Sequence, residues 1–161
     1  MQDALVTTVS GDAVARLYRE QGAKLWRSLF AYTGDRELAS DALAEALAQA
    51  LGRGEAIESL DRWVWRAAFR IAGGELRNRS RQAPMSSSDS RSYEMAEPAV
   101  DLIRALTRLS PNQRAVVILH VYADYRTRDV ARILGITQTT VRVHLSQARR
   151  RLRTLLEDRD G

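Results

Sequence analysis

The chain has 161 residues, a length that suits one domain or two small ones. It contains no cysteine, which excludes disulfides, thiol catalysis and cysteine–zinc sites. The net charge of +5 comes almost entirely from arginine, because Lys24 is the only lysine. There is no signal-peptide pattern, and no apolar run approaches the roughly 18 residues that a membrane span needs. We therefore expect a cytoplasmic protein with no membrane contact.

Three helices are predicted in residues 1–81, because apolar residues recur there at helical spacing. The first runs through Val14 and Phe30. The second carries an apolar face of leucines and alanines from Leu38 to Leu51, and Gly52 and Gly54 end it. The third begins near residues 59–61, and the Gly73–Gly74 pair predicts an interruption in it, at about 1 kcal/mol per glycine. No alternating apolar run predicts a strand, so we expect this domain to be all-α.

Residues 82–98 are predicted to be a flexible linker, because they include five serines, two prolines and few apolar residues. Residues 99–161 are predicted to form a second helical domain. Its first helix runs from Asp101 to about Leu109. A capping box, Ser110-Pro-Asn-Gln113, then starts a helix whose AVVILHVY run predicts the buried centre of this domain.

The strongest motif is a helix-turn-helix over residues 127–141. Ala131 is small enough for two helices to cross closely, and Gly135 tolerates the positive φ of a short turn. Thr137 is positioned to cap the second helix, and Val141 and Leu145 anchor that helix to the core. The residues at its start would meet base edges in the major groove, and the later arginines suit phosphates. The alternative interpretation is a helical hairpin that only packs.

Arginine is concentrated in two stripes. Residues 126–153 hold eight arginines against the single acid Asp129, and residues 62–81 hold six against Glu75. Two separate basic stripes indicate two contacts with nucleic acid. Each stripe alone could equally be a solvated helix face.

At this point the chain resembles the extracytoplasmic-function (ECF) sigma factors of bacterial RNA polymerase, in the sigma-70 family. The resemblance is strongest from Ala105 to Leu156, where the family's capped opening, Ala-x-x-Leu-Gly-Ile helix, Thr-Val-Arg recognition helix and Arg-rich tail all occur. It marks residues 99–161 as a region 4-like domain that reads the minus-thirty-five element. The residues implied to contact this upstream element are Gln138, Thr139, Thr140, Arg142, Val143, Ser146, Gln147, Arg149 and Arg150.

The first 81 residues resemble the family's region 2. Gly34-Asp35 and the 39–47 segment correspond to its Gly-Asp and Ala-Glu-Asp-x-x-Gln-Glu blocks, with Ala44 in place of Gln. The resemblance implies core polymerase docking by Asp41, Ala44 and Glu45. The block Trp63-Val-Trp-Arg-Ala-Ala-Phe-Arg70 corresponds to the segment that opens the minus-ten element. The residues implied to contact that downstream element are Trp63, Arg66, Arg70, Arg77 and Arg79.

These observations predict a sigma factor that binds core RNA polymerase and directs promoter-specific initiation, with promoter DNA as its second partner. The family often has an anti-sigma factor, so the resemblance makes one a candidate partner. The alternative is a stand-alone helix-turn-helix regulator whose N-terminal half senses a ligand or dimerises. An enzyme is not expected, since His120 and His144 have no nucleophile or metal partner at suitable spacing. We expect no catalytic residue, no metal site and no cofactor.

Overall fold

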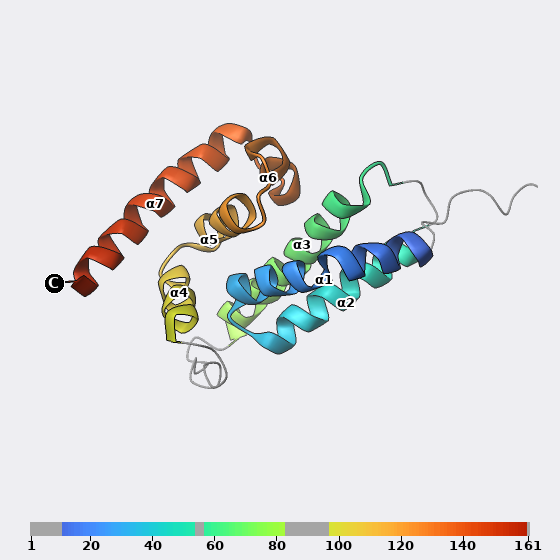
Figure 1. Ribbon diagram of the computed structural model, residues 1–161, viewed down its shortest axis with the longest axis horizontal. Coiled ribbons are helices and arrows are strands. Elements are labelled where there is room, and N and C mark those ends of the chain that lie inside the picture. Colours follow the sequence, from blue (N-terminus) through green and yellow to red (C-terminus); the bar gives the residue numbers. More distant parts are fainter. Residues whose placement is uncertain (1–10, 54–56, 83–96, 161) are drawn as a thin grey trace, which may run out of the picture.

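The computed structural model describes residues 11–53, 57–82 and 97–160, and within these ranges every regular element is helical. This confirms the all-α prediction (Figure 1). The helices are α1 (Gly11–Thr33), α2 (Arg36–Gly52), α3 (Leu60–Gln82), α4 (Glu97–Thr107), α5 (Pro111–Val117), α6 (Thr127–Leu134) and α7 (Gln138–Asp160), with a π-helical turn, η3 (Ile118–Tyr122), after α5.

Helices α1, α2 and α3 pack side by side as the N-terminal bundle (Figure 1). The alanine face of α2 lies inside, and Ala39, Ala46 and Ala50 are fully buried, so neighbouring helices approach closely. Trp65 on α3 fills the centre with 1% of its surface exposed, and its Nε1 donates a hydrogen bond to Gln21 Oε1 at 3.0 Å. The predicted apolar face is wrong at its edge, because Leu51 is 48% exposed in the last turn of α2.

Helix α3 is continuous through Gly73 and Gly74, so the predicted interruption is wrong. Gly73 is buried, and a Cβ atom there would lie 3.2 Å from the Tyr32 hydroxyl of α1. The glycine therefore allows the ring of Tyr32 to pack against the helix. Packing outweighs the modest helix propensity of glycine at this position.

The C-terminal half follows its predicted start signals. Ser110 accepts from the backbone N–H of Gln113, whose side chain accepts from the backbone N–H of Ser110, so the capping box is confirmed. Helix α4 begins at Glu97, four residues before the predicted Asp101. The buried-centre prediction holds for Val116 and Leu119 and is wrong for the end of the run: Val121 and Tyr122 are 62% and 46% exposed. They lie at the end of η3, whose first two residues, Ile118 and Leu119, are buried.

The two halves pack against each other. Helix α6 lies on α3, and α4 and α5 lie against α1 (Figure 1). The rings of Trp65 and Tyr125 meet edge to face, with centroids 5.2 Å apart, and their buried neighbours form one continuous core across both halves. Most of the predicted linker lies outside the described residues.

Candidate nucleic-acid interface

The helix-turn-helix is formed by α6, a short turn and α7. Gly135 ends α6 with a left-handed φ of 69°, and its N–H donates to Ala131 O. Thr137 Oγ1 accepts from the backbone N–H of Thr140 at 3.1 Å, which confirms the predicted cap of α7. Val141, 0% exposed, and Leu145, 8% exposed, hold α7 on the core. Each local signal in the motif thus has the structural role that its residue type predicts.

The outer face of α7 carries the predicted upstream-element residues. All of them are exposed except Thr140, which is half-buried and shares a 2.8 Å hydrogen bond with the Thr137 hydroxyl. A shallow hollow of about 400 Å³ on this face is lined by Arg142, Leu145, Ser146, Arg149, Arg150 and Arg153. Gln147 Oε1 accepts from Gln113 Nε2 at 3.1 Å, so its amide is oriented by α5. This face presents guanidinium, amide and hydroxyl donors together, as recognition of a DNA groove requires.

Some residues of the basic stripe on α3 are exposed, and others contact residues elsewhere in the chain. Arg70 and Arg77 are exposed. Arg66 donates from Nη1 to the backbone carbonyl of Arg132 on α6 at 3.3 Å. Trp63 is half-buried, and the guanidinium of Arg53 lies 5.4 Å from its ring centroid. The predicted downstream residues therefore lie on one helix. Arg70 and Arg77 are exposed, whereas Arg66 bonds to the C-terminal half of the chain.

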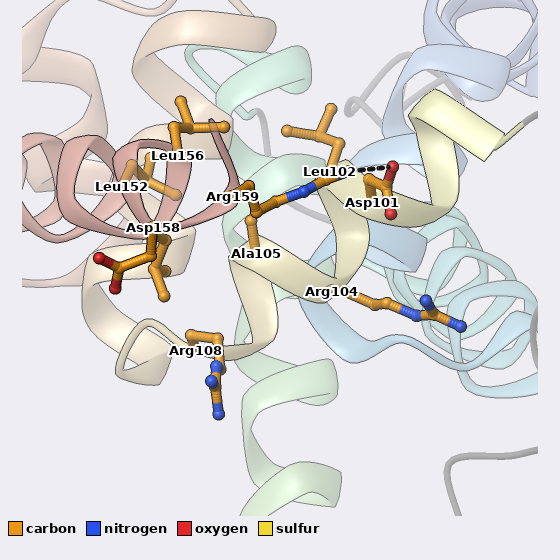
Figure 2. Close-up of a pocket in the computed structure, with 10 residues that line it drawn as sticks. Asp101, Leu102, Arg104, Ala105, Arg108, Leu152, Leu156, Asp158 and Arg159 are labelled. Carbon is orange, nitrogen blue, oxygen red and sulfur yellow. Dashed lines mark hydrogen bonds and ion pairs between the residues drawn. The ribbon is translucent and has the colours of Figure 1, made fainter. Parts of the chain in front are cut away.

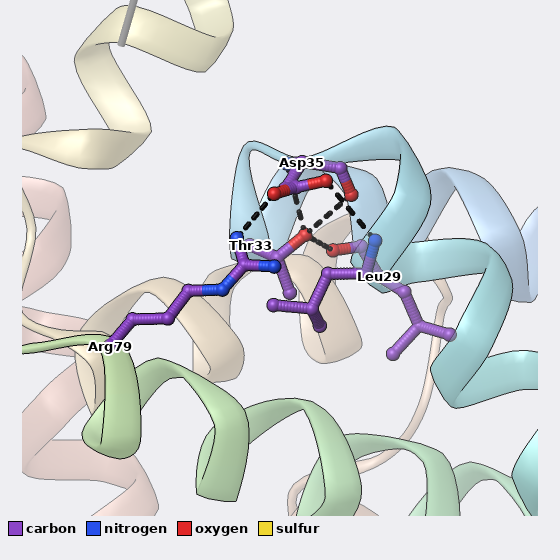
Figure 3. A network of polar contacts seen from close by, with 5 residues as sticks. Leu29, Thr33, Asp35 and Arg79 are labelled. Atoms are coloured by element: carbon purple, nitrogen blue, oxygen red, sulfur yellow. Dashed lines mark hydrogen bonds and ion pairs between the residues drawn. The ribbon is translucent and has the colours of Figure 1, made fainter. Parts of the chain in front are cut away.

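Arg79, also predicted to contact DNA, pairs with Asp35 at the turn between α1 and α2 (Figure 3). The same carboxylate caps α2 by accepting from the Leu38 N–H at 3.1 Å. The Thr33 hydroxyl stabilises the turn through hydrogen bonds with the backbone of Leu29 and Asp35. The hydrogen bond to Asp35 raises the pKa of the Arg79 guanidinium. Arg79 thus joins the end of α3 to the start of α2, a contact that the sequence analysis did not predict.

The residues predicted to dock on polymerase lie together on α2. Asp41, Ala44 and Glu45 are exposed and line a groove of about 620 Å³ between α2 and α3. Glu75 of α3 is on the opposite wall. Arg79 of α3 also lines this groove, but its guanidinium pairs with Asp35, so the three carboxylates still suit a partner surface rich in arginine or lysine.

A further groove, of about 750 Å³, lies between α4 and the end of α7 (Figure 2). Leu102 and Leu156 are 59% and 56% exposed in it. Arg159 and Asp101 bridge the two helices with an ion pair of 3.0 Å. No pattern in the sequence predicted this groove.

The two histidines show no catalytic arrangement. His120 Nδ1 lies 2.9 Å from the Tyr125 carbonyl, as a satisfied interior histidine would. His144 is half-buried, and its Nδ1 has no hydrogen-bond partner among the described residues. Within the same ranges, no group of three or more His, Asp or Glu side chains is arranged to hold a metal ion. No described helix is both long and apolar enough to cross a membrane.

The family model for sigma-70 region 4 matches residues 99–152, which run from α4 to the middle of α7. The ECF RNA polymerase sigma factor SigL of Mycobacterium tuberculosis is 33% identical, over 93% of this chain and 96% of its own length. The chain belongs to the ECF sigma factors. A second ECF sigma factor of M. tuberculosis, SigM, is 30% identical over 96% of the chain and 83% of its own length.

The fold of this sigma factor is also found in a solved structure, the sigma factor RpoE in complex with the anti-sigma factor NepR from Bartonella quintana. It superposes with a TM-score of 0.72 at 22% identity, over 92% of this chain and 98% of that chain. Family membership over nearly the whole length confirms a sigma factor that directs transcription initiation. The alternative of a stand-alone regulator is therefore wrong, because its N-terminal half would have to be unrelated to the family.

Proposed function

We propose that this sigma factor reads the upstream promoter element with α7, holds the downstream element along α3 and docks on core polymerase through α2. The observation that carries the proposal is the outer face of α7, where all the predicted side chains but Thr140 are exposed. Val141 and Leu145 fix this helix to the core. A recognition helix needs this combination of a rigid base and a polar outer face.

Arg142 is the residue of this face best suited to guanine, because it lies in the first turns of α7, where base edges are reached. Arg149 and Arg150 lie two turns later and suit phosphates. The Arg142→Ala variant should lose about five- to 100-fold in affinity for a selected promoter duplex and relax the preference at one base pair. Arg151→Ala removes the same charge from α7 outside the hollow and should reduce affinity less, with no change in preference.

The test is transcription in vitro with core RNA polymerase on a promoter library. The proposal expects transcripts from a defined set of promoters, and the Arg142→Ala variant should shift that set while Arg151→Ala leaves it unchanged. Equal effects of both variants would contradict the assignment of α7 residues to base recognition.

The α2 groove has its own test. A double Asp41→Asn and Glu45→Gln change should weaken binding to core polymerase, because two carboxylates facing a basic partner lose their charge. The control, Glu20→Gln, removes an exposed carboxylate of α1 that lies outside the groove. Unchanged polymerase binding of the double variant would remove α2 from the proposal.

We also propose an anti-sigma factor as a partner, because the RpoE structure of the same fold was solved with one. Copurification of the tagged chain from its own cells tests this: the bound protein should suppress promoter-specific transcription when added back. A cytoplasmic location, the lack of catalytic activity and the lack of a cofactor remain predictions from the sequence.

A further inference from the structure

The amide side chain of Gln147, on the outer face of α7, is bonded to a residue of α5. Gln113 donates from Nε2 to Gln147 Oε1 at 3.1 Å, across 34 residues of sequence. Gln113 is half-buried, whereas Gln147 is exposed and follows Val143 by roughly one helical turn. The contact therefore joins α5 to the surface of α7 that is proposed to read the upstream element.

The direction of this bond is determined by the capping box of α5. An amide side chain has one oxygen, which accepts, and one nitrogen, which donates. The backbone N–H of Ser110 can only donate, and Gln113 Oε1 accepts from it at 3.2 Å. Gln113 must therefore turn its nitrogen toward Gln147, and Gln147 must meet it with its oxygen. The Nε2 group of Gln147 is the end of that amide left for DNA.

This polarity limits which base edges Gln147 can read. An unconstrained glutamine recognises adenine with both ends of its amide, because the oxygen accepts from N6 while the nitrogen donates to N7. With its oxygen held by Gln113, Gln147 offers a base only a donor. Guanine suits a donor best, since its major-groove edge has two acceptors, O6 and N7, and no donor. Cytosine, which presents only the N4 donor, suits it least.

We propose that Gln113 is a positioning residue for promoter recognition: through the capping box of α5 it makes Gln147 a hydrogen-bond donor, and Gln147 selects guanine at one position of the upstream element. The inference rests on the proposed role of α7 in reading that element. A single neutral hydrogen bond predicts a preference for guanine over cytosine of about two- to tenfold at that position.

An isosteric change tests whether the polarity comes from Gln113. Gln113→Glu keeps the capping box, because glutamate also accepts from the backbone N–H of the capping residue. Its second carboxylate oxygen can only accept, so Gln147 must turn its amide over and donate to it. The oxygen of Gln147 then faces DNA. The preferred base should change from guanine to cytosine or adenine, which carry donors at N4 and N6.

The measurement is selection of promoters by the full chain bound to core polymerase, from a library randomised through the upstream element. Sequencing of the bound promoters gives the base preference at every position. Gln147→Ala identifies the position that Gln147 reads, because the preference there should disappear. Gln147→Glu presents only acceptors whatever Gln113 does, so it should show the same change of base as Gln113→Glu.

Asn112→Asp is the matched control for charge, because it adds the same negative charge to an exposed residue of α5 next to Gln113. Repulsion from phosphates should weaken binding to all promoters in both variants, but only Gln113→Glu should change the preferred base. Thermal unfolding separates a structural role. Gln113→Glu should retain the Tm because the cap is kept, whereas Gln113→Ala should lower it. Gln113→Ala also frees both ends of the Gln147 amide, so adenine should join the accepted bases.

The outcomes separate this inference from the proposed function. If Gln147→Ala removes a preference that Gln113→Glu leaves unchanged, or if Asn112→Asp changes the base as Gln113→Glu does, Gln113 does not position Gln147. If Gln147→Ala weakens binding to all promoters equally, Gln147 contacts a phosphate and the inference is wrong, while a shift of promoters by Arg142→Ala keeps the proposed function. A complex with core polymerase that selects no promoter overturns both.

Discussion

Two glycines, Gly74 in α3 and Gly135 in the helix-turn-helix, should respond to alanine with opposite signs. Neither is crowded: a Cβ atom at Gly135 meets nothing within 4 Å, and one at Gly74 meets only Arg77 Nη2 at 3.9 Å. Their backbones differ, because Gly74 lies inside a helix and Gly135 has a φ of +69°. Gly74→Ala should raise the free energy of unfolding by about 0.5–1 kcal/mol. Gly135→Ala should lower it by about 1–2 kcal/mol, the cost of a left-handed alanine.

The two variants should therefore differ by roughly 1.5–3 kcal/mol, or about 3–12 °C in Tm for a chain of this size. Thermal and urea unfolding followed by far-ultraviolet circular dichroism measures both quantities. Gly135→Asn should recover part of the loss, because asparagine visits the left-handed region more readily. Shifts of the same sign for Gly74→Ala and Gly135→Ala would refute the reasoning, since it attributes the whole difference to φ.

Three further changes test single contacts. Thr137→Ala should lower the free energy of unfolding by about 1 kcal/mol through the lost cap of α7, and Thr137→Ser should retain the cap; equal losses would contradict this. Arg114→Lys keeps the charge but cannot serve the carbonyls of Tyr32, Leu106 and Leu109 together, so urea unfolding should show a loss of about 1–3 kcal/mol. Burial raises the pKa of Tyr32, so its protonated phenol contributes fully to the free energy of unfolding below about pH 10 and less as the pH rises further. Tyr32→Phe should therefore reduce the loss of stability at alkaline pH.

The helix-turn-helix could be predicted because its signals are local. The capping hydroxyls of Ser110 and Thr137 each bond a backbone N–H three residues away, and Gly135 sets its own turn. Residue type and short spacing determine such contacts, so the sequence contains them directly. The exposed positions of α7 follow from the same periodicity, once Val141 and Leu145 define the buried face.

The contacts between elements could not be predicted in this way. Asp35 and Arg79 are 44 residues apart, the ion-paired Arg62 and Asp129 are 67 apart, and no periodic pattern links either pair. Gly73 also shows that a prediction from residue type alone can be wrong when distant residues pack together. Propensity alone predicts a break, but the helix continues because the Tyr32 hydroxyl packs where a side chain would be. Long-range packing therefore decided which arginines of the basic stripe are engaged within the chain.

Arg79 is where a structural and a DNA-binding role can be separated by experiment. Asp35→Asn keeps an oxygen that caps α2 but removes the charge that holds Arg79, so the stability loss should stay below about 1 kcal/mol. Asp35→Ala also removes the cap and should cost about 0.5–2 kcal/mol more.

The change in affinity for a short oligothymidylate distinguishes the two roles. This probe is suitable because backbone charge and stacking bind single strands with little sequence preference. If Arg79 contacts the strand, Asp35→Asn releases its guanidinium and tightens binding, while Arg79→Gln weakens binding and reduces the salt dependence by about one phosphate contact. Arg81→Gln removes an exposed charge at the same end of α3 and serves as the matched control. Should Arg79→Gln lower only the stability and leave oligothymidylate binding equal to that of Arg81→Gln, Arg79 is a brace between α3 and α2. The downstream contact would then rest on Arg66, Arg70 and Arg77.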